Sequence, residues 1–222
     1  GRIAGEHAPG VALVVYNKAM NCYFFGTFNP IHKGHIEIAR RVKELKGYER
    51  VIFVPCYIPP HKHDELISFN HRYNMAILAI GEDNVSDIES KLKVPSYTYR
   101  TIQKLYENNN NQKINFIIGY DQFFKLESWK EPDILKKLIN FNVIPRKFPN
   151  GQIIGEKTFE YFKNKGFSFE VLDIGLLDVS SNMIRKYLAQ NLDITGLTTL
   201  EVRKYIENNG LYSKLSERKF IG

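Results

Sequence analysis

Five short apolar runs alternate along this chain with segments whose apolar residues recur at helical spacing, and this alternation limits the possible folds. The run at 50–57, RVIFVPCY, is apolar almost throughout, which is typical of a strand buried on both faces of a parallel sheet. Strands that alternate with helices form right-handed βαβ units, in which helices cover both faces of the sheet. The five predicted strands are 22–25, 50–57, 113–121, 141–147 and 167–174.

The helical segments begin and end at residues with suitable local chemistry. Ser96 is placed to cap a helix, Pro132 lies in a first turn where its missing N–H costs nothing, and Gly210 follows the last helix as a stop. The polar run ENNNNQK at 107–113 is interpreted as a helix-to-strand loop. The six predicted helices are 34–45, 70–80, 96–107, 131–139, 180–190 and 198–209.

These elements predict an α/β fold, a Rossmann-like doubly wound parallel sheet with helices on both faces and a small C-terminal helical part. Residues 20–222 are interpreted as a single domain whose C-terminal helices start at about residue 181. Residues 1–19 do not match the pattern that follows, and Met20 resembles a natural start. We therefore interpret 1–19 as a leader or extension of uncertain origin, in which the run VALVVY could form a strand.

The composition excludes several classes of protein. Cys22 and Cys56 are too few for a disulfide framework or a zinc site, and both lie in apolar runs where a buried free thiol is expected. No apolar run approaches the ~18 residues of a membrane span, and no signal-peptide pattern is present, so a cytoplasmic location is expected. The 222 residues carry a net charge of +7, which indicates either a polyanionic ligand or an excess of solvated lysines.

Polar motifs follow the predicted strands, where doubly wound sheets bind their ligands. The motif GTFNPIHKGH at Gly26–His35 combines a glycine turn with two histidines three residues apart, which share a face if they lie in a first helical turn. Imidazoles and backbone N–H groups there can donate to phosphoryl oxygens and stabilise a transition state that gains charge. A pair of surface histidines is the alternative. A metal site is less favoured, because no carboxylate or third histidine lies nearby in the sequence.

Further motifs point to the same end of the sheet. Serines that start a helix and an arginine in its first turns indicate an anion site at Ser180–Arg185, and an ordinary helix cap with a solvated arginine is the alternative. The single tryptophan, Trp129, has charged and polar neighbours, which favours a surface or cleft position over the core. Arg72, within a predicted helix, is interpreted as structural.

The ordered motifs also resemble a known family. GTFNPIHKGH, IPPHK, PSYT, IIGYDQFFKLESW and VSSNMIRKYL resemble the nucleotidyltransferases with the HxGH signature, and more narrowly the bacterial-type nicotinate-nucleotide adenylyltransferases, from Met20 to about Tyr212. The chain departs from the family pattern twice. Phe25 replaces the first of two glycines before Thr27, and Asn182 replaces the threonine of the last motif. Asparagine can still cap a helix or donate a hydrogen bond.

The resemblance implies a reaction and a role for each matching residue. Nicotinate mononucleotide and ATP, with Mg²⁺ on the ATP phosphates, would give deamido-NAD and pyrophosphate, through in-line attack of the mononucleotide phosphate on the α-phosphorus. His32 and His35 would be the catalytic residues. The residues implied to bind ATP are Gly26, Thr27, Phe28, His32, His35, Gly119, Asp121, Arg146, Ser180, Ser181, Asn182 and Arg185. Those implied to bind the mononucleotide are Asn29, Lys62, Tyr97, Thr98 and Trp129.

Several alternatives stay open at this point. The substrate could be nicotinamide mononucleotide, which differs by an amide in place of one carboxylate. The chain could also be another enzyme of the superfamily, such as a phosphopantetheine adenylyltransferase or a cytidylyltransferase. A basic nucleic-acid-binding module would need basic residues interleaved with aromatic ones on one face, whereas the lysines here are scattered over several helices. Neither a membrane nor a nucleic-acid partner is expected, and a homo-oligomer is left open.

Overall fold

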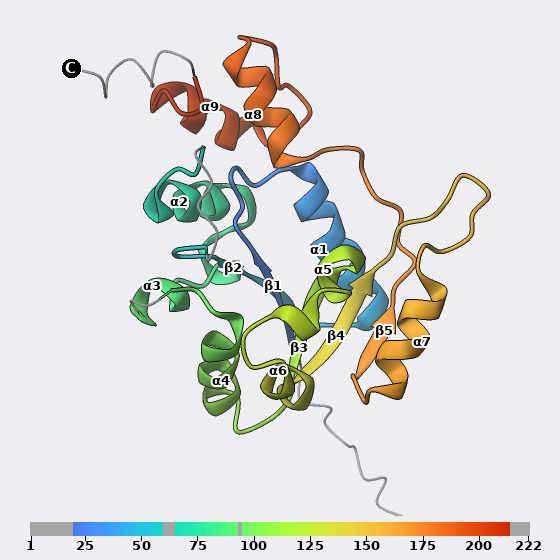
Figure 1. Ribbon diagram of the computed structural model, residues 1–222. Helices are drawn as coiled ribbons and strands as arrows, with labels where there is room; N and C mark the ends of the chain where they lie inside the picture. Colours follow the sequence, from blue (N-terminus) through green and yellow to red (C-terminus); the bar gives the residue numbers. More distant parts are fainter. Residues whose placement is uncertain (1–19, 60–64, 93–94, 214–222) are drawn as a thin grey trace, which may run out of the picture.

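The computed structural model describes residues 20–59, 65–92 and 95–213, which form one five-stranded sheet covered by helices (Figure 1). The strand order is β2-β1-β3-β4-β5, and every neighbouring pair is parallel. The predicted α/β fold with a parallel sheet is therefore confirmed. The strands are β1 (Asn21–Gly26), β2 (Arg50–Pro55), β3 (Ile114–Gly119), β4 (Ile139–Ile144) and β5 (Phe169–Val171).

The direction of winding reverses between β1 and β3. β2 lies on one side of β1, whereas the chain continues from β3 through β4 to β5 on the other side. Ligands of doubly wound sheets bind in the crevice beyond the carboxyl ends of the strands at such a reversal. Phe24 and Ile117 are paired in register, so Gly26 and Gly119, each two residues further along, end their strands at the same level.

Helices cover both faces of this sheet. Their bounds are α1 (Lys33–Lys46), α2 (Phe69–Ile80), η1 (Glu82–Asn84), α3 (Ile88–Leu92), α4 (Thr98–Asn108), α5 (Tyr120–Phe123), η2 (Leu126–Ser128), α6 (Pro132–Leu138), α7 (Glu156–Asn164), α8 (Ser181–Ala189) and α9 (Leu200–Asn208). Successive side chains of a strand point to opposite faces. Ile117 of β3 accordingly packs in a core cluster with residues of α1, α2, α8 and α9, whereas Phe116 and Ile118 pack in a second cluster with residues of α4, α5, α6 and α7.

Several elements differ from the sequence prediction, which contains neither α3 nor the short helices η1 and η2 and assigns the first two residues of α5, Tyr120 and Asp121, to a strand. The pattern does not predict α7, which contributes only Phe159 and Phe162 to the buried core. Ser96 does not cap a helix, because α4 starts at Thr98 and the Ser96 hydroxyl instead accepts the N–H of Ile58 at 3.0 Å. β5 keeps only three of the residues predicted at 167–174. The contact between Ser96 and Ile58 is tertiary, and local propensity contains no information about it.

Other local predictions hold. Pro132 occupies the first turn of α6, and Gly210 follows the end of α9 with a left-handed φ of 58°. Cys22 and Cys56 are both free thiols, but only Cys22 is buried as predicted, whereas Cys56 is half-buried; burial raises the pKa of Cys22 to about 12 and that of Cys56 to about 11. The segment 1–19, with its VALVVY run, lies outside the described residues, and the division into a leader and a single domain stays a prediction.

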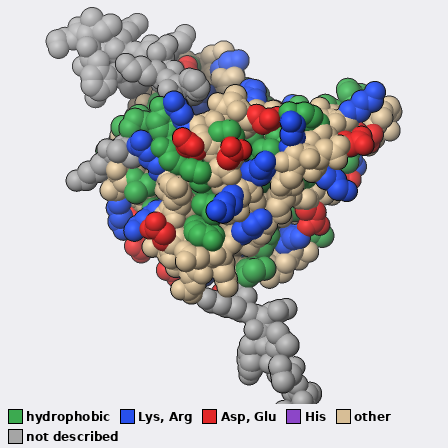
Figure 2. Space-filling model, turned by 60° about the horizontal axis from the view of Figure 1, so that its bottom comes forward, with side chains coloured by type: hydrophobic (Ala, Val, Ile, Leu, Met, Phe, Trp, Pro, Cys, Tyr) green, Lys and Arg blue, Asp and Glu red, His purple; other side chains and the backbone are tan. Residues whose placement is uncertain are grey.

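The surface carries its basic residues in a scattered arrangement on the face drawn in Figure 2, where Lys and Arg side chains are interspersed with acidic and hydrophobic ones. That distribution fits solvated lysines better than a continuous basic groove for nucleic acid. No helix in the part of the chain that the structure describes is long and apolar enough to cross a membrane.

Candidate active site

The β1–α1 loop places His32 and His35 in the first turn of α1, beyond the carboxyl end of β1. His32 is the N-cap, and its Nδ1 accepts the N–H of Gly34 at 3.0 Å and the N–H of His35 at 3.3 Å. The Nδ1 of His35 accepts the N–H of His32 at 3.1 Å in return. The two rings stack with their centroids 3.6 Å apart. The predicted shared face of the two histidines is confirmed, and the imidazoles replace the usual serine and glutamate of a capping box.

The same hydrogen bonds assign the tautomer of each ring. Because Nδ1 of each ring accepts a backbone N–H, Nδ1 carries no proton, and the neutral ring then carries its proton on Nε2. Burial lowers the pKa of His32 to about 4. Burial, and to a smaller extent the neighbouring His32 ring, lowers the pKa of His35 well below its usual value. Near pH 7 the site therefore contains two neutral imidazoles, each with an Nε2–H that can donate to an anion.

Two glycines make this arrangement possible by leaving room for neighbouring rings. A Cβ on Gly34 would lie 2.8 Å from Cε1 of His32, and a Cβ on Gly26 would lie 2.8 Å from Cζ of Phe28. Phe28 is 2% exposed, and its ring meets the His35 ring edge-on with centroids 4.9 Å apart. The space at Gly26 is thus filled by Phe28, which supports His35 from the core. Because the Phe28 ring is buried, the ATP contact that the resemblance implies for this residue would have to be made by its backbone.

Helix α8 brings the second predicted anion site against this loop. Ser180 caps α8 by accepting the N–H of Met183, and the Ser181 hydroxyl donates to the carbonyl of Pro30 at 2.9 Å. Arg185 donates through Nη1 to the carbonyl of Asn29 at 2.8 Å and through Nε to Glu65 at 3.0 Å. The Arg185 side chain is 19% exposed, so it is not a solvated surface arginine. Asn182 is exposed in the first turn of the same helix.

The ends of β3 and β4 bring three more predicted residues to the same side of the sheet. Gly119 ends β3, and a Cβ there would lie 3.0 Å from Oδ1 of Asp121, so the carboxylate folds back over the glycine. Gly119 pairs with Ile144 at the end of β4, and the exposed Arg146 follows two residues later. The carboxylate of Asp121 and the guanidinium of Arg146 therefore follow adjacent strand ends, next to the reversal point.

Two of the residues predicted for the mononucleotide lie at the start of α4, close to the residue that follows Trp129. Tyr97 and Thr98 are the N-cap and the first residue of that helix. Lys130, which follows Trp129, lies with its Nζ 5.8 Å from the centroid of the Tyr97 ring. The guanidinium carbon of Arg100 lies 5.6 Å from the same centroid. Trp129 is packed against the second core cluster without being part of its buried set, which agrees with a cleft position more than with a fully buried one.

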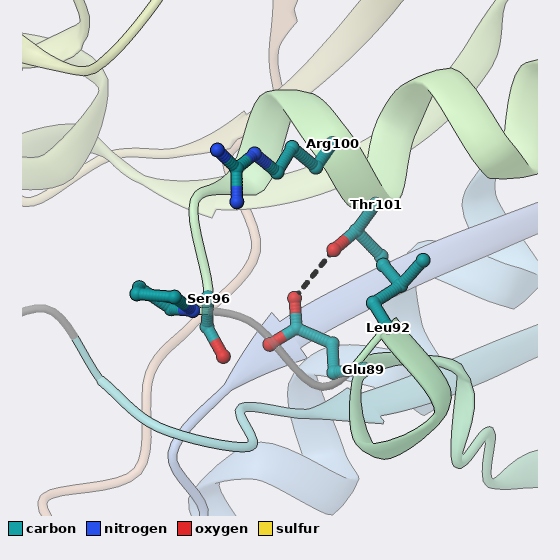
Figure 3. A pocket seen from close by; sticks show the side chains of 6 residues that line it. Glu89, Leu92, Ser96, Arg100 and Thr101 are labelled. Atoms are coloured by element: carbon teal, nitrogen blue, oxygen red, sulfur yellow. Dashed lines mark hydrogen bonds between the residues drawn. The ribbon is translucent and has the colours of Figure 1, made fainter.

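A small pocket next to this helix is filled by the side chains that line it (Figure 3). Glu89 accepts the Thr101 hydroxyl at 2.6 Å, and the Arg100 guanidinium points away from that pair in Figure 3. The pocket has no room for a water molecule. Its lining residues, Glu89, Leu92, Pro95, Ser96, Arg100 and Thr101, therefore support the start of α4 and leave no space for a ligand.

Two polar side chains near the loop are held by other parts of the protein. Arg72 is fully buried and donates to the carbonyls of Thr27, Tyr57 and Ile67, which agrees with its structural interpretation. Asn29 donates to the carbonyl of Glu65 and accepts from Ile67 and Tyr212. The role of Asn29 towards the mononucleotide stays a prediction, and Lys62 with its neighbour His61 lies outside the described residues.

The side chains described around this loop are not a donor set that would itself hold Mg²⁺. Mg²⁺ prefers oxygen ligands in an octahedral arrangement, whereas the loop presents imidazole N–H groups and α8 adds the guanidinium of Arg185. In the described ranges, no three His, Cys, Asp or Glu side chains come together as they would around a metal ion. These residues are thus suited to an anion, and any accompanying Mg²⁺ would have to be held by ligand oxygens and water.

Several residues reach this loop from far along the chain and were not predicted from the sequence. Thr198 and Tyr212 donate hydrogen bonds to the β1–α1 loop, and Glu65 accepts one from Arg185. Arg100 flanks Tyr97 at the start of α4. None of the four belongs to a motif whose spacing signals a contact with Gly26–His35. Only the three-dimensional arrangement identifies them.

Known proteins resemble this chain over most of its length. A family model described as cytidylyltransferase-like matches residues 23–187. A "Probable nicotinate-nucleotide adenylyltransferase" of Caldicellulosiruptor saccharolyticus is 35% identical over 195 residues, covering 86% of this chain and 97% of the relative. The protein of the same name from Clostridium tetani is 38% identical over 196 residues, covering 85% of this chain and 96% of the relative.

Solved structures agree on the fold. The Plasmodium falciparum nicotinic acid mononucleotide adenylyltransferase complexed with NaAD has a TM-score of 0.71 at 24% identity, covering 88% of this chain and 98% of that one. The matched family model spans the two histidines, the start of α8 and every strand between them. The chain therefore belongs to the cytidylyltransferase-like family and, within it, to the nicotinate-nucleotide adenylyltransferases.

Proposed function

We propose that this protein transfers the adenylyl group of ATP to nicotinate mononucleotide, giving deamido-NAD and pyrophosphate in NAD biosynthesis. An oxygen of the mononucleotide phosphate attacks the α-phosphorus of ATP and forms a new P–O bond. The bond from the α-phosphorus to the oxygen bridging it to the β-phosphorus breaks, and pyrophosphate leaves with that electron pair. The attacking phosphate oxygen is already ionised near pH 7, so the step needs neither a general base nor a covalent enzyme intermediate.

The observation that carries the proposal is the stacked pair of neutral imidazoles at the reversal point of the sheet. Ser181 and Arg185 of α8 are hydrogen-bonded to the backbone of the same loop, and imidazole N–H groups with a serine-capped helix start and an arginine form a donor set suited to phosphate oxygens. We assign His32 and His35 to the phosphates at the reacting centre, and Ser180, Ser181, Asn182 and Arg185 to the departing pyrophosphate. Such a site works by positioning and charge stabilisation, because little covalent chemistry is left for the protein to do. We assign Mg²⁺ to the ATP phosphates, held by their oxygens and water.

The remaining predicted residues fit the two ends of the dinucleotide product. Gly119, Asp121 and Arg146 would contact the adenosine, since a carboxylate at a strand end can accept hydrogen bonds from ribose hydroxyls. Tyr97, Thr98 and Trp129 would contact the pyridine ring. The two cations that flank Tyr97, Arg100 and Lys130, favour a ring that carries a carboxylate over one that carries an amide.

The proposal is tested by pyrophosphate release from Mg·ATP with nicotinate mononucleotide, nicotinamide mononucleotide and phosphopantetheine as parallel acceptors. We expect fast release with the first and slower release with the second. Fast release with phosphopantetheine alone would move the chain to another branch of the superfamily.

A substitution at the histidine pair tests the site itself. His35→Ala should lose about 10²-fold or more in turnover, because it removes a donor to the charge that develops in the transition state. His71→Ala is the matched control, since the His71 ring pairs with Tyr205 of α9 and lies outside the motif Gly26–His35. Near-normal turnover of His35→Ala would show that the site has been wrongly assigned.

A further inference from the structure

The loop that carries His32 is held by hydrogen bonds from residues near the C-terminal end of the described chain. Four positions of the loop are involved, and their partners come from α8, from the α8–α9 connection and from the residues after α9. In Figure 1, α8 and α9 lie over the end of the sheet where β1 leads into α1. The bonds are Ser181 Oγ to Pro30 O, Arg185 Nη1 to Asn29 O, Thr198 Oγ1 to Ile31 O, Lys33 N to Leu197 O, and Tyr212 Oη to Asn29 Oδ1.

Tyr212 holds the side chain of Asn29, the first of these four loop positions. The Tyr212 hydroxyl donates to Oδ1 of Asn29 at 2.6 Å, and Asn29 is 5% exposed. Nδ2 of Asn29 donates to the carbonyl of Glu65 at 3.1 Å, so Asn29 bridges the residues after α9 and the segment that leads into α2. Burial raises the pKa of the Tyr212 phenol, which therefore keeps its proton and remains a donor. Tyr212 also has a left-handed φ of 61°, unusual for a residue with a side chain.

Thr198 holds the backbone immediately before His32. Thr198 is 4% exposed, and its hydroxyl donates to the carbonyl of Ile31 at 2.9 Å. The N–H of Lys33, on the other side of His32, donates to the carbonyl of Leu197 at 2.9 Å. The peptide groups that flank His32 are thus both fixed by adjacent residues of the α8–α9 connection. Since the His32 ring caps α1 and stacks on His35, a shift of this backbone moves both rings.

We propose that Thr198 and Tyr212 are positioning residues for adenylyl transfer, which hold the β1–α1 loop so that the Nε2–H groups of His32 and His35 meet the reacting phosphate. Neither residue touches the reacting atoms in this arrangement. This inference rests on the proposed function for its kinetic readout. Geometry errors of about 1 Å at a reacting centre can cost about 10²-fold in rate. Removing either hydroxyl should therefore lower kcat by at least about tenfold.

The first test compares two tyrosine variants. Tyr212→Phe removes the hydrogen bond to Asn29 and keeps the ring. Tyr205→Phe, on α9, removes hydrogen bonds to His71 and Asn74 of α2 and leaves the loop untouched. We expect kcat to fall in Tyr212→Phe with KM for ATP and the mononucleotide changed by less than about threefold, and both constants to stay near wild type in Tyr205→Phe. Equal kcat values in the two variants would overturn the proposal for Tyr212.

The second test uses rescue at Thr198. Thr198→Val keeps the shape of the side chain and removes the hydroxyl, whereas Thr198→Ser keeps the hydroxyl. We expect Thr198→Val to lose kcat and Thr198→Ser to recover most of it. If Thr198→Ser loses as much kcat as Thr198→Val, the residue acts through packing and the proposal for Thr198 is wrong.

A third readout does not depend on the reaction. The imidazole ¹⁵N resonances of His32 and His35, measured in the full chain labelled at histidine, report the hydrogen bonding of each ring. We expect them to shift in Tyr212→Phe and to stay in place in Tyr205→Phe. Unchanged resonances in Tyr212→Phe would overturn the positioning role. If wild-type protein releases no pyrophosphate while these resonances still shift, the proposed function has failed and the positioning contact stands.

Discussion

Gly34→Ala is the substitution for which the structure gives the most direct expectation. The added Cβ would lie 2.8 Å from Cε1 and 2.9 Å from Nδ1 of His32. Carbon atoms in contact normally stay about 3.5–4.0 Å apart, so the His32 ring must move by roughly 0.7–1.2 Å. That movement breaks the bonds from the N–H groups of Gly34 and His35 to Nδ1, and it disturbs the stack on His35.

Two free-energy effects of this substitution can be separated. Loss of a side-chain cap costs about 0.5–2 kcal/mol of stability, and the gain of about 1 kcal/mol from replacing a helical glycine by alanine offsets part of it. The net loss of stability should thus be at most about 1 kcal/mol, or about 2–4 °C in Tm for a chain of this size. Displacement of the donors by about 1 Å should cost about 10²-fold in kcat. We therefore expect a large loss of rate with a small loss of stability.

The matched control is Gly47→Ala at the other end of the same helix. Gly47 has a φ of 69°, and apart from its own chain neighbours no described residue lies within 4 Å of the place a Cβ would take, so alanine there strains the backbone without touching the histidines. Left-handed backbone costs an L-residue about 1–2 kcal/mol. We expect Gly47→Ala to lower Tm at least as much as Gly34→Ala and to keep its kcat. Turnover of Gly34→Ala within twofold of the control would refute this reasoning.

Three further predictions follow from the site. Glu65→Gln should lower the KM for ATP several-fold in steady-state kinetics, because it removes the carboxylate that competes with a triphosphate for Arg185; a higher KM would mean that Glu65 orients the arginine instead. Trp129→Ala should raise the KM for the mononucleotide and leave the KM for ATP nearly unchanged, and the reverse pattern would remove Trp129 from the pyridine site. The pKa of His32 is about 4 in the folded protein against 6.5 as its ordinary value, so its neutral form stabilises the fold fully above pH 6.5 and this contribution is lost as pH falls through 6.5 towards 4. Denaturant titrations at pH 7 and pH 4.5 should show this loss of stability in wild type and a smaller loss in His32→Asn, which still caps α1 but does not titrate. An equal pH dependence of stability in both proteins would rule out His32 as the source of the loss.

Much of the fold could be predicted because each signal is local. The apolar run of β2 and the helical spacing in α1 come from adjacent residues, and the parallel sheet follows from their alternation. The spacing of His32 and His35 likewise predicted a shared face, because residues three apart are neighbours on a helix. The local rule was not sufficient at Ser96, where a contact with Ile58 took the hydroxyl that could have capped α4.

The amino-acid sequence by itself determined the order of the five strands and of six helices, the end of the sheet where the polar motifs lie, and the presence of two histidines on one face. The tertiary structure decided what holds them there. Phe28 fills the space at Gly26, and Tyr212 and Ser181 contact the loop from positions 183 and 151 residues away from their partners. Periodicity reports only contacts within a few turns of the chain, and so contacts between distant segments are determined by how the helices pack on the two faces of the sheet.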